Sequence, residues 1–444
     1  MQKLYVTDFR KLFEPWYLVA ITAILIVVPL FPKFPAFRIA GTYVAVRLED
    51  FLILGTILIF SIPIISNIKS IFKNNVVRAI ALFLIIGGIS VFSGIYLTQT
   101  INIKIGLLHW IRRIEYLSLF FVGLTYMKIN TEKQGGRVVE YMIKILLIVN
   151  FLVFAYGLGQ HYFNFPVIVT QNEEYSKGIA LRWVPGAHIN STFAGHYDLA
   201  SYLVLIIPIF VASFFVVKDK ISKFLLASST LAGFWLFSVA VSRISIVAFL
   251  VATTVSLFLL KKYKEIVVIG FISVIAFGFS PDLRVRYGRI FDVIKQKISS
   301  VIVVHAQEDG NVNEDRSTSI RLKVEWPRAF RAFYKNPIVG TGYSSITLAT
   351  DNDYLRALGE TGLLGLSAFI LIFVCLYQIF RKYNFDISKS TSAFDPVIVA
   401  CFIGSTVGIL ITALFIDVFE ASKFATIYWL FAGLVAGKVQ QNNV

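Results

Sequence analysis

Long apolar runs, separated by short polar and basic segments, recur along the whole chain. A helix needs roughly 20 mostly apolar residues to cross the hydrocarbon core of a membrane, and it satisfies its own backbone hydrogen bonds in lipid. The pattern predicts an all-α polytopic membrane protein with about 12 transmembrane helices. We expect them near residues 16–31, 51–65, 79–96, 114–127, 143–160, 199–216, 224–241, 244–260, 266–279, 362–379, 397–415 and 424–437.

The apolar run 224–260 contains one charged residue, Arg243. A single helix of this length would reach about 55 Å, whereas the hydrocarbon core is about 30 Å thick. We therefore predict two spans joined by a tight turn at Ser242 and Arg243, which puts Arg243 at a membrane face.

Lys and Arg residues are unevenly distributed between the two sides of these spans. Segments 1–15, 66–78, 128–144, 217–223, 261–265, 380–396 and 437–444 hold 20, and the short loops opposite, 32–50, 97–113, 242–243 and 416–423, hold 8. Basic loops stay in the cytoplasm. We expect a multi-pass protein of the cytoplasmic membrane with both termini cytoplasmic and its active face extracytoplasmic.

This orientation makes residues 1–444 a single membrane domain with two longer extracytoplasmic segments. One is the outer loop 161–196, and the other is the large loop 280–361 between the ninth and tenth transmembrane helices. The large loop is expected to contain an amphipathic helix at 281–300, a polar loop at 304–318, a second helix at 319–335 kinked at Pro327, and a tight glycine turn at 339–342.

Composition agrees with a membrane location. The chain is 57% hydrophobic and 15% charged, whereas soluble domains average about a quarter charged residues. The net charge is +16, but the basic residues sit in short clusters between apolar runs, so the expected partners are membrane lipids and no nucleic acid. Cys375 and Cys401 lie in apolar runs, so we expect neither a disulfide nor a metal site from them. The first apolar run follows a basic segment without a cleavage site and is expected to be retained.

Several arginines gather at the predicted outer face. The planar donor fork of arginine matches phosphate oxygens, so the set indicates a site for a lipid-linked diphosphate. The alternative is that each side chain reaches lipid headgroups or one of the ten carboxylates in 280–361. The set consists of Arg182, Arg243, Arg284, Arg286, Arg321 and Arg328.

Two polar segments offer candidate proton acceptors. In 181–202, His188 and His196 titrate near neutral pH, although Asn190, Ser191 and Asp198 alternatively cap the following helix.

In 350–362, Asp351 is a candidate general base or a helix N-cap. Glu360 is a candidate partner of an arginine or a substrate hydroxyl, or a residue at a helix end. Gly340 and Gly342 form a phosphate-binding loop or, more commonly, a simple turn.

The chain lacks Walker, HExxH, CxxC and GxSxG motifs. The interiors of the predicted spans are almost free of charge, which argues against an ion-coupled transporter.

Several separate elements together resemble the family of O-antigen ligases and polymerases, the glycosyltransferases of the bacterial envelope. The most specific are NPIVGTG within 326–342, DNDYL at 351–355 and ETGLLG at 360–365. The others are VRLED at 46–50, Arg182, STF at 191–193, HYDLA at 196–200 and SR at 242–243.

The resemblance implies a metal-independent, inverting glycosyl transfer without a cofactor. The donor would be a glycan on undecaprenyl diphosphate and the acceptor a sugar hydroxyl on a glycan or glycolipid, in the synthesis of lipopolysaccharide or another surface polysaccharide. Arg182 and Arg243 take the diphosphate-binding role by resemblance, and Arg321 is our nomination for a third arginine. Asn352, Tyr354, Glu360, Gly340 and Gly342 would support the site.

One departure affects the assignment. Ligases commonly have His where this chain has Asp351, so the base is Asp351 or His196, and a polymerase remains open beside a ligase. The alternatives from other classes are a transporter of lipid-linked glycans, for which Asp417 is the clearest acidic candidate, and a receptor whose outer loop binds a ligand. Sequence does not decide the sugars, the linkage, the envelope type or the oligomeric state.

Overall fold

The computed structural model describes residues 2–31, 35–40, 42, 44–130, 132–168, 180–182, 188–240, 242–278, 320–346, 349–390 and 392–441. The predicted amphipathic helix at 281–300, the predicted polar loop at 304–318, and Arg284 and Arg286 lie outside these residues. The described part is almost entirely helical, so the predicted all-α fold is confirmed.

The helices of the first half are α1 (Gln2–Leu30), α2 (Leu48–Ser66), α3 (Ile68–Ile71), α4 (Asn75–Phe92) with a π-helical turn (Ser93–Leu97), α5 (Ile103–Ile129) and α6 (Glu132–Tyr162). Those of the second half are α8 (His196–Phe214), α9 (Lys220–Ala240), α10 (Arg243–Leu259), α11 (Tyr263–Gly278), α14 (Trp326–Lys335), α15 (Asp353–Phe380), α16 (Phe394–Thr412) and α17 (Ser422–Gln441). A π-helical turn (Arg321–Glu325) precedes α14, and 3-10 turns occupy Ile387–Lys389 and Val418–Glu420.

Two antiparallel strand pairs lie between helices. Strand β1 (Pro35–Arg38) pairs with β2 (Ala45–Arg47), and β3 (Pro166–Ile168) pairs with β4 (Ala180–Arg182). In β4, the backbone of Arg182 is opposite Pro166. The second pair therefore ties the two ends of the segment 166–182 together within the predicted outer loop.

Each of the twelve predicted spans overlaps a helix. Among the described residues, seven helices are long and apolar enough to cross a membrane: Leu48–Ser66, Asn75–Leu97, Gly136–Tyr162, His196–Phe214, Lys220–Ala240, Asp353–Phe380 and Phe394–Thr412. Pro15–Leu30 and Arg243–Leu259 are shorter apolar helices. The predicted turn at Ser242 is confirmed, because α9 ends at Ala240 and α10 begins at Arg243.

Large apolar side chains on the outside of the bundle follow helical stripes. These side chains are half or more exposed, at a spacing of three or four residues that puts them on one face: Leu54, Leu58, Ile62 and Ile65 of α2, and Ile85, Ile89 and Phe92 of α4. Contiguous apolar stripes of this kind suit lipid rather than water. The protein is therefore a multi-pass membrane protein.

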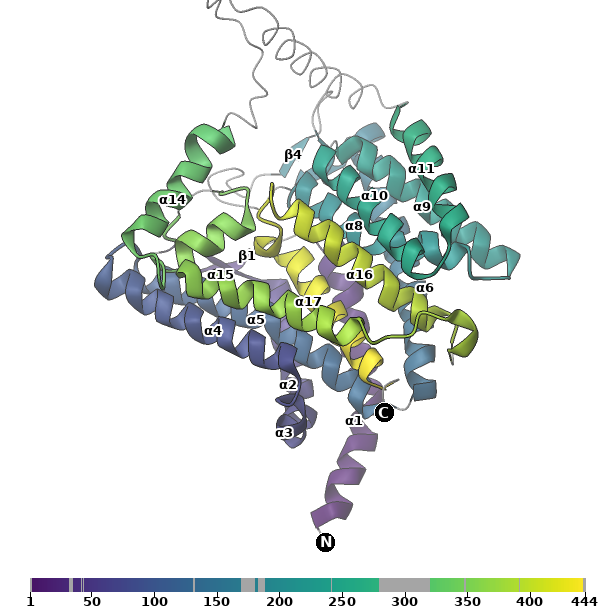
Figure 1. The fold of residues 1–444 in the computed structure, drawn as a ribbon, viewed down its shortest axis with the longest axis horizontal. Helices are drawn as coiled ribbons and strands as arrows, with labels where there is room; N and C mark the ends of the chain where they lie inside the picture. The colour runs from purple at the N-terminus through teal and green to yellow at the C-terminus, as the bar shows by residue number, and fades with distance from the viewer. Residues whose placement is uncertain are drawn as a thin grey trace, which may run out of the picture.

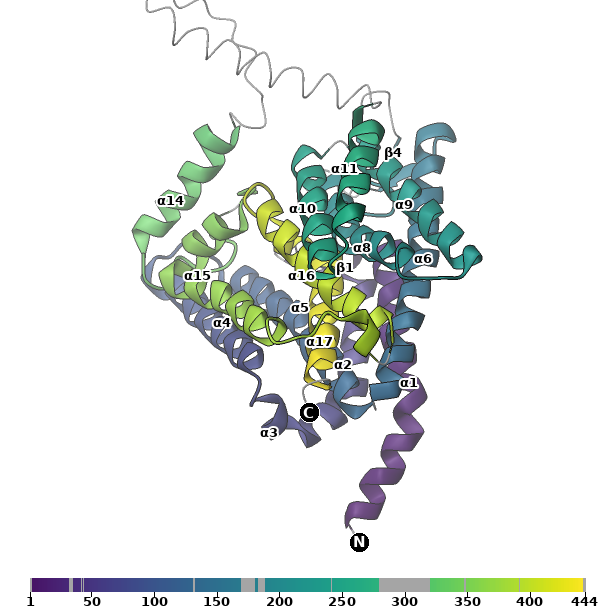
Figure 2. The same cartoon turned by 45° about the vertical axis from the view of Figure 1, so that its right-hand side comes forward.

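The last helix, α17, lies at the centre of the bundle, with α4, α5 and α15 on one side and α6, α8, α9, α10 and α11 on the other (Figures 1 and 2). Close backbone approach makes this possible. A Cβ on Gly123 of α5 would lie 2.5 Å from the Leu430 carbonyl oxygen of α17, and one on Gly408 of α16 would lie 2.5 Å from the Ala248 carbonyl oxygen of α10. Gly433 and Gly437 repeat the small-xxx-small spacing that lets membrane helices pack closely.

A buried lysine at the start of α17 contacts two segments from the first half of the chain. Lys423, at the start of α17, is 1% exposed. Its Nζ donates to the carbonyl oxygens of Pro29 at 3.2 Å and Thr192 at 2.6 Å, and it lies 5.1 Å from the ring centroid of Phe193. These contacts hold the end of α1 and the segment before α8 against the start of α17.

Candidate active site

The start of α15 is fastened to the end of α16. Asn352 is the N-cap, because its Oδ1 accepts from the Leu355 amide at 2.9 Å. Its Nδ2 donates to the Leu414 carbonyl oxygen at 3.0 Å, and the Tyr354 hydroxyl donates to that of Leu410 at 2.9 Å. The predicted supporting residues Asn352 and Tyr354 thus fix the direction in which α15 leaves the site.

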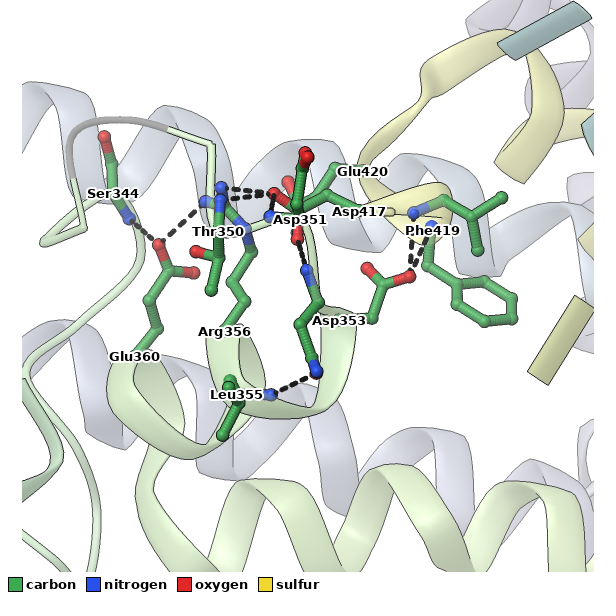
Figure 3. Close-up of polar contacts among 12 residues, drawn as sticks. Ser344, Thr350, Asp351, Asp353, Leu355, Arg356, Glu360, Asp417, Phe419 and Glu420 are labelled. Carbon is green, nitrogen blue, oxygen red and sulfur yellow. Dashed lines mark hydrogen bonds and ion pairs between the residues drawn. The ribbon is translucent and has the colours of Figure 1, made fainter. Parts of the chain in front are cut away.

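Asp417 organises the backbone just before α15 (Figure 3). Its carboxylate accepts from the amides of Thr350 (2.8 Å), Asp351 (3.2 Å) and Asn352 (3.0 Å), and from Arg356 Nη2 at 2.8 Å. Although burial acts in the opposite direction, Arg356 and these hydrogen bonds lower the pKa of Asp417. A charged Asp417 therefore holds three consecutive residues in place, including the predicted base.

Arg321 and Asp351 meet directly. The Asp351 Oδ2 accepts from Arg321 Nε at 3.0 Å and Nη2 at 2.7 Å. Arg321 also interacts with the side chain of Tyr197, so the π-helical turn, the start of α15 and the start of α8 come together here. Burial raises the pKa of Asp351 even though Arg321 opposes this.

The alternative reading of Asp351 as a helix cap is wrong, because Asn352 is the cap. Asp351 is one residue earlier, in the left-handed region at φ 48°. Asn and Asp tolerate this region better than other side-chain-bearing residues. Its conformation, its amide contact with Asp417 and its pairing with Arg321 all orient the carboxylate.

The glycine turn packs against the middle of α15. Gly340 and Gly342 have φ values of 74° and 90°. The amides of Gly340, Thr341 and Gly342 donate to the carbonyl oxygens of Asn336, Gly359 and Glu360, at 3.0, 3.2 and 2.8 Å respectively. Because these amides are already bonded, the turn has a packing role and does not offer them to phosphate.

Glu360 is buried next to this turn. Its Oε1 accepts from the Ser344 amide at 3.0 Å and lies 3.3 Å from Arg356 Nη1. Gly362, two residues later, breaks the helical geometry of α15, so Glu360 is near the end of the first helical segment. The sequence suggested an arginine or a substrate hydroxyl as the partner of Glu360, and in the structure the partner is an arginine, Arg356.

A second set of charged residues lies next to Asp417, Arg356 and Glu360. Arg113 of α5 pairs with Glu420 and lies over the ring of Tyr343, 5.3 Å from its centroid. With Arg356 and Glu360, these residues line a cavity of about 40 Å³, which has room for a water molecule. The charged residues of α5, α15 and the turn at 418–420 therefore meet around this cavity.

The remaining predicted residues are placed as follows. His196 is the first residue of α8, and its ring centroid is 4.4 Å from that of His188 and 4.0 Å from that of Tyr197. Gly195, rather than Asn190, Ser191 or Asp198, is the N-cap of α8. Arg243, predicted in the turn before the span 244–260, is the first residue of α10, and Arg182 is in β4. The phosphate-binding roles of Arg182 and Arg243 stay predictions.

Arg356, Arg113 and Glu325 were not singled out from the sequence. Arg356 follows directly after the DNDYL element, and Glu325 lies in the predicted helix 319–335, two residues before Pro327. That helix does not kink at Pro327. Instead, α14 begins at Trp326, with Pro327 in its first turn, after the π-helical turn.

Chemically, the site combines guanidinium groups, which can bind anions, with carboxylates of different protonation tendency. Asp417 is held ionised, whereas burial favours the neutral form of Asp351 and raises the pKa of Glu325 to about 7. Neighbouring carboxyl groups with pKa values pushed apart are typical of acid–base sites.

Comparison with known proteins gives one positive result. A family model described as O-antigen ligase matches residues 227–370. No curated protein matches the chain. The matched segment runs from α9 into α15 and includes Arg243, Arg321, Asp351 and Glu360. Over this segment, the chain is similar to the O-antigen ligase family.

Proposed function

We propose that this chain transfers a glycan from undecaprenyl diphosphate to a sugar hydroxyl in the assembly of a surface polysaccharide. The observation that carries the proposal is the contact between Arg321 and Asp351 inside the O-antigen ligase segment. An arginine fork can bind diphosphate oxygens, and a nearby carboxylate can accept the proton of a hydroxyl.

In the proposed reaction, Arg182, Arg243 and Arg321 bind the diphosphate and stabilise the negative charge that develops as it leaves. Asp351 or His196 receives the acceptor proton while the hydroxyl oxygen attacks the anomeric carbon from the opposite side. The configuration is inverted, and the arginines take the place of a metal ion.

We further propose that the site faces the outside of the cytoplasmic membrane. The start of α1 and the end of α17 lie at the same end of the bundle (Figures 1 and 2), which is compatible with both termini being cytoplasmic. The loops on that side carry most of the basic residues between spans.

Reconstitution into vesicles tests the reaction. The purified protein, with a glycan-diphosphate lipid extracted from cells that lack this chain, should form a new glycosidic bond to the acceptor and release undecaprenyl diphosphate. Movement of the lipid across the bilayer without bond formation would instead favour a transporter.

Arg243→Ala is expected to abolish transfer while the protein still inserts and accumulates, because the diphosphate loses a charged donor. Arg331→Ala is the matched control, since Arg331 is an exposed arginine of α14. Normal transfer by Arg243→Ala would remove Arg243 from the mechanism.

Deletion of the gene separates the two activities of the family. Free lipid-linked polymer with unmodified acceptor indicates a ligase. Single repeat units on the acceptor indicate a polymerase.

A further inference from the structure

Three polar atoms at the start of α14 have no hydrogen-bond partner among the described residues, although each is shielded from solvent. They are Oε2 of Glu325, Nε1 of Trp326 and Nη1 of Arg328. Shielded polar groups are almost always paired in folded proteins, because an unpaired one loses its hydration without replacement. An unused acceptor on Glu325 and an unused donor on Arg328 are what a bound hydroxyl group would satisfy.

Two of these residues are on the same helical face as Arg321. Glu325 follows Arg321 by four residues and precedes Arg328 by three, a spacing that places side chains along one stripe. The charged groups that act on Glu325 are Asp351, Arg321, Asp417 and Arg328. Glu325 therefore lies beside the Arg321–Asp351 contact.

Asp351 is held by Arg321. Its Oδ2 accepts from both Nε and Nη2 of Arg321, and its amide donates to Asp417. This charge-assisted contact orients the arginine. Glu325, by contrast, has an oxygen without a partner among the described residues. Burial and the neighbouring Asp351 raise the pKa of Glu325 to about 7, close to the value that favours general-base catalysis at neutral pH.

We propose that Glu325, in place of Asp351 or His196, is the general base of the transfer, that Arg328 donates a hydrogen bond to the acceptor sugar, and that Asp351 is a positioning residue for Arg321. The inference rests on the proposed function. In the step, the acceptor O–H proton moves to Glu325 Oε2 and the hydroxyl oxygen bonds to the anomeric carbon. The bond from that carbon to the diphosphate breaks, and the diphosphate leaves with the electron pair.

Glu325→Gln keeps the size of the side chain and removes the base. We expect transfer to a sugar acceptor to fall about 10²–10⁴-fold, the usual contribution of a general base, while binding of undecaprenyl diphosphate is unchanged. Arg331→Gln, an exposed change on the same helix, is expected to keep the wild-type rate. Wild-type transfer by Glu325→Gln would overturn the proposal.

Azide gives a second readout that a structural role would not produce. Azide is an anion and attacks without losing a proton, so Glu325→Ala with azide should release undecaprenyl diphosphate and form the glycosyl azide as fast as wild type. If Glu325→Ala reacts more slowly than wild type with azide, as it does with the sugar acceptor, Glu325 is not the base. Glu325→Asp should recover part of the transfer to sugar, with the rising limb of its pH profile displaced from the wild-type position near pH 7.

The two levels of the proposal fail differently. If the wild-type protein forms no glycosidic bond, the proposed function is wrong. If the wild type transfers and Glu325→Gln transfers equally well, only the assignment of Glu325 is wrong.

Discussion

At the scale of single residues, charge in this site is balanced locally. Asp417 is bonded to Arg356 and to three amides, and Arg356 also reaches Glu360. Charged groups out of water are stable only when such contacts replace their hydration. The arrangement of the site therefore depends on all of these contacts of Asp417, Arg356 and Glu360.

We expect Asp417→Asn to lower the free energy of unfolding by about 3–5 kcal/mol, because a buried ion pair is broken and Arg356 keeps only Glu360 as a charged partner. Thermal unfolding in detergent measures the effect. The matched control is Asp386→Asn, which changes an exposed cap that accepts from the Ser388 amide and should have little effect, because Asn caps a helix about as well as Asp. Equal effects of the two substitutions would show that Asp417 acts only as a cap.

Glu325 makes stability depend on pH. Its pKa is about 7 in the folded protein and about 4.3 in an unfolded chain. The folded state therefore binds the proton more tightly, and stability is lost as pH rises from about 4.3 to 7. We expect the melting temperature to fall across this range more in wild type than in Glu325→Gln. Parallel pH curves for the two proteins would contradict the raised pKa.

The sequence identified the members of the site better than their pairing. Asp351, Arg321 and Glu360 were singled out by type and motif, but the contact of Arg321 with Asp351 joins residues 30 positions apart. Asn352 rather than Asp351 caps α15 because Asp417, distant in sequence, fixes the preceding backbone. Such pairings depend on tertiary structure, which local pattern does not contain.

At the scale of elements, hydropathy located the helices because the need for an apolar surface in lipid is local. Pro327 was expected to kink a helix, but it lies in the first turn of α14, where its missing amide hydrogen costs nothing. The docking of the glycine turn on α15 was not predictable, because it requires the kink at Gly362 and the contact of two segments.

Gly340→Ala should destabilise the protein by more than about 1–2 kcal/mol, the cost of the left-handed region for a residue with a Cβ. The additional cost arises because the Cβ would collide with the Glu360 carbonyl oxygen. Gly270→Ala in α11 is the control, since a Cβ there meets nothing within 4 Å. Unfolding in detergent compares them, and an unchanged Gly340→Ala would show that the turn is not docked as described.

At the scale of the whole molecule, a buried ion pair connects the start of α16 with the end of α17. Lys438 Nζ lies 2.9 Å from Asp395 Oδ2, and the two side chains are 1% and 0% exposed. The pair sits at the opposite end of α17 from Lys423, so charged contacts hold the central helix near both of its ends.

Lys438→Met should cost about 3–5 kcal/mol, because Asp395 would remain buried without its cation. The double variant Lys438→Met, Asp395→Leu should recover much of this loss. Lys144→Met is the control, since Lys144 and Glu140 form an exposed pair at 2.8 Å worth about 0–1 kcal/mol. A double variant as unstable as the single one would show that the charge itself is not the cause.

The central position of α17 has a consequence for biosynthesis. Lys423 and the glycines of α17 occupy the middle of the bundle, yet the ribosome makes them after all the helices that pack around them. Those helices enter the membrane before the segment that fills the space between them. Nascent chains that stop before residue 422 therefore expose this space to lipid and to membrane proteases until α17 is inserted.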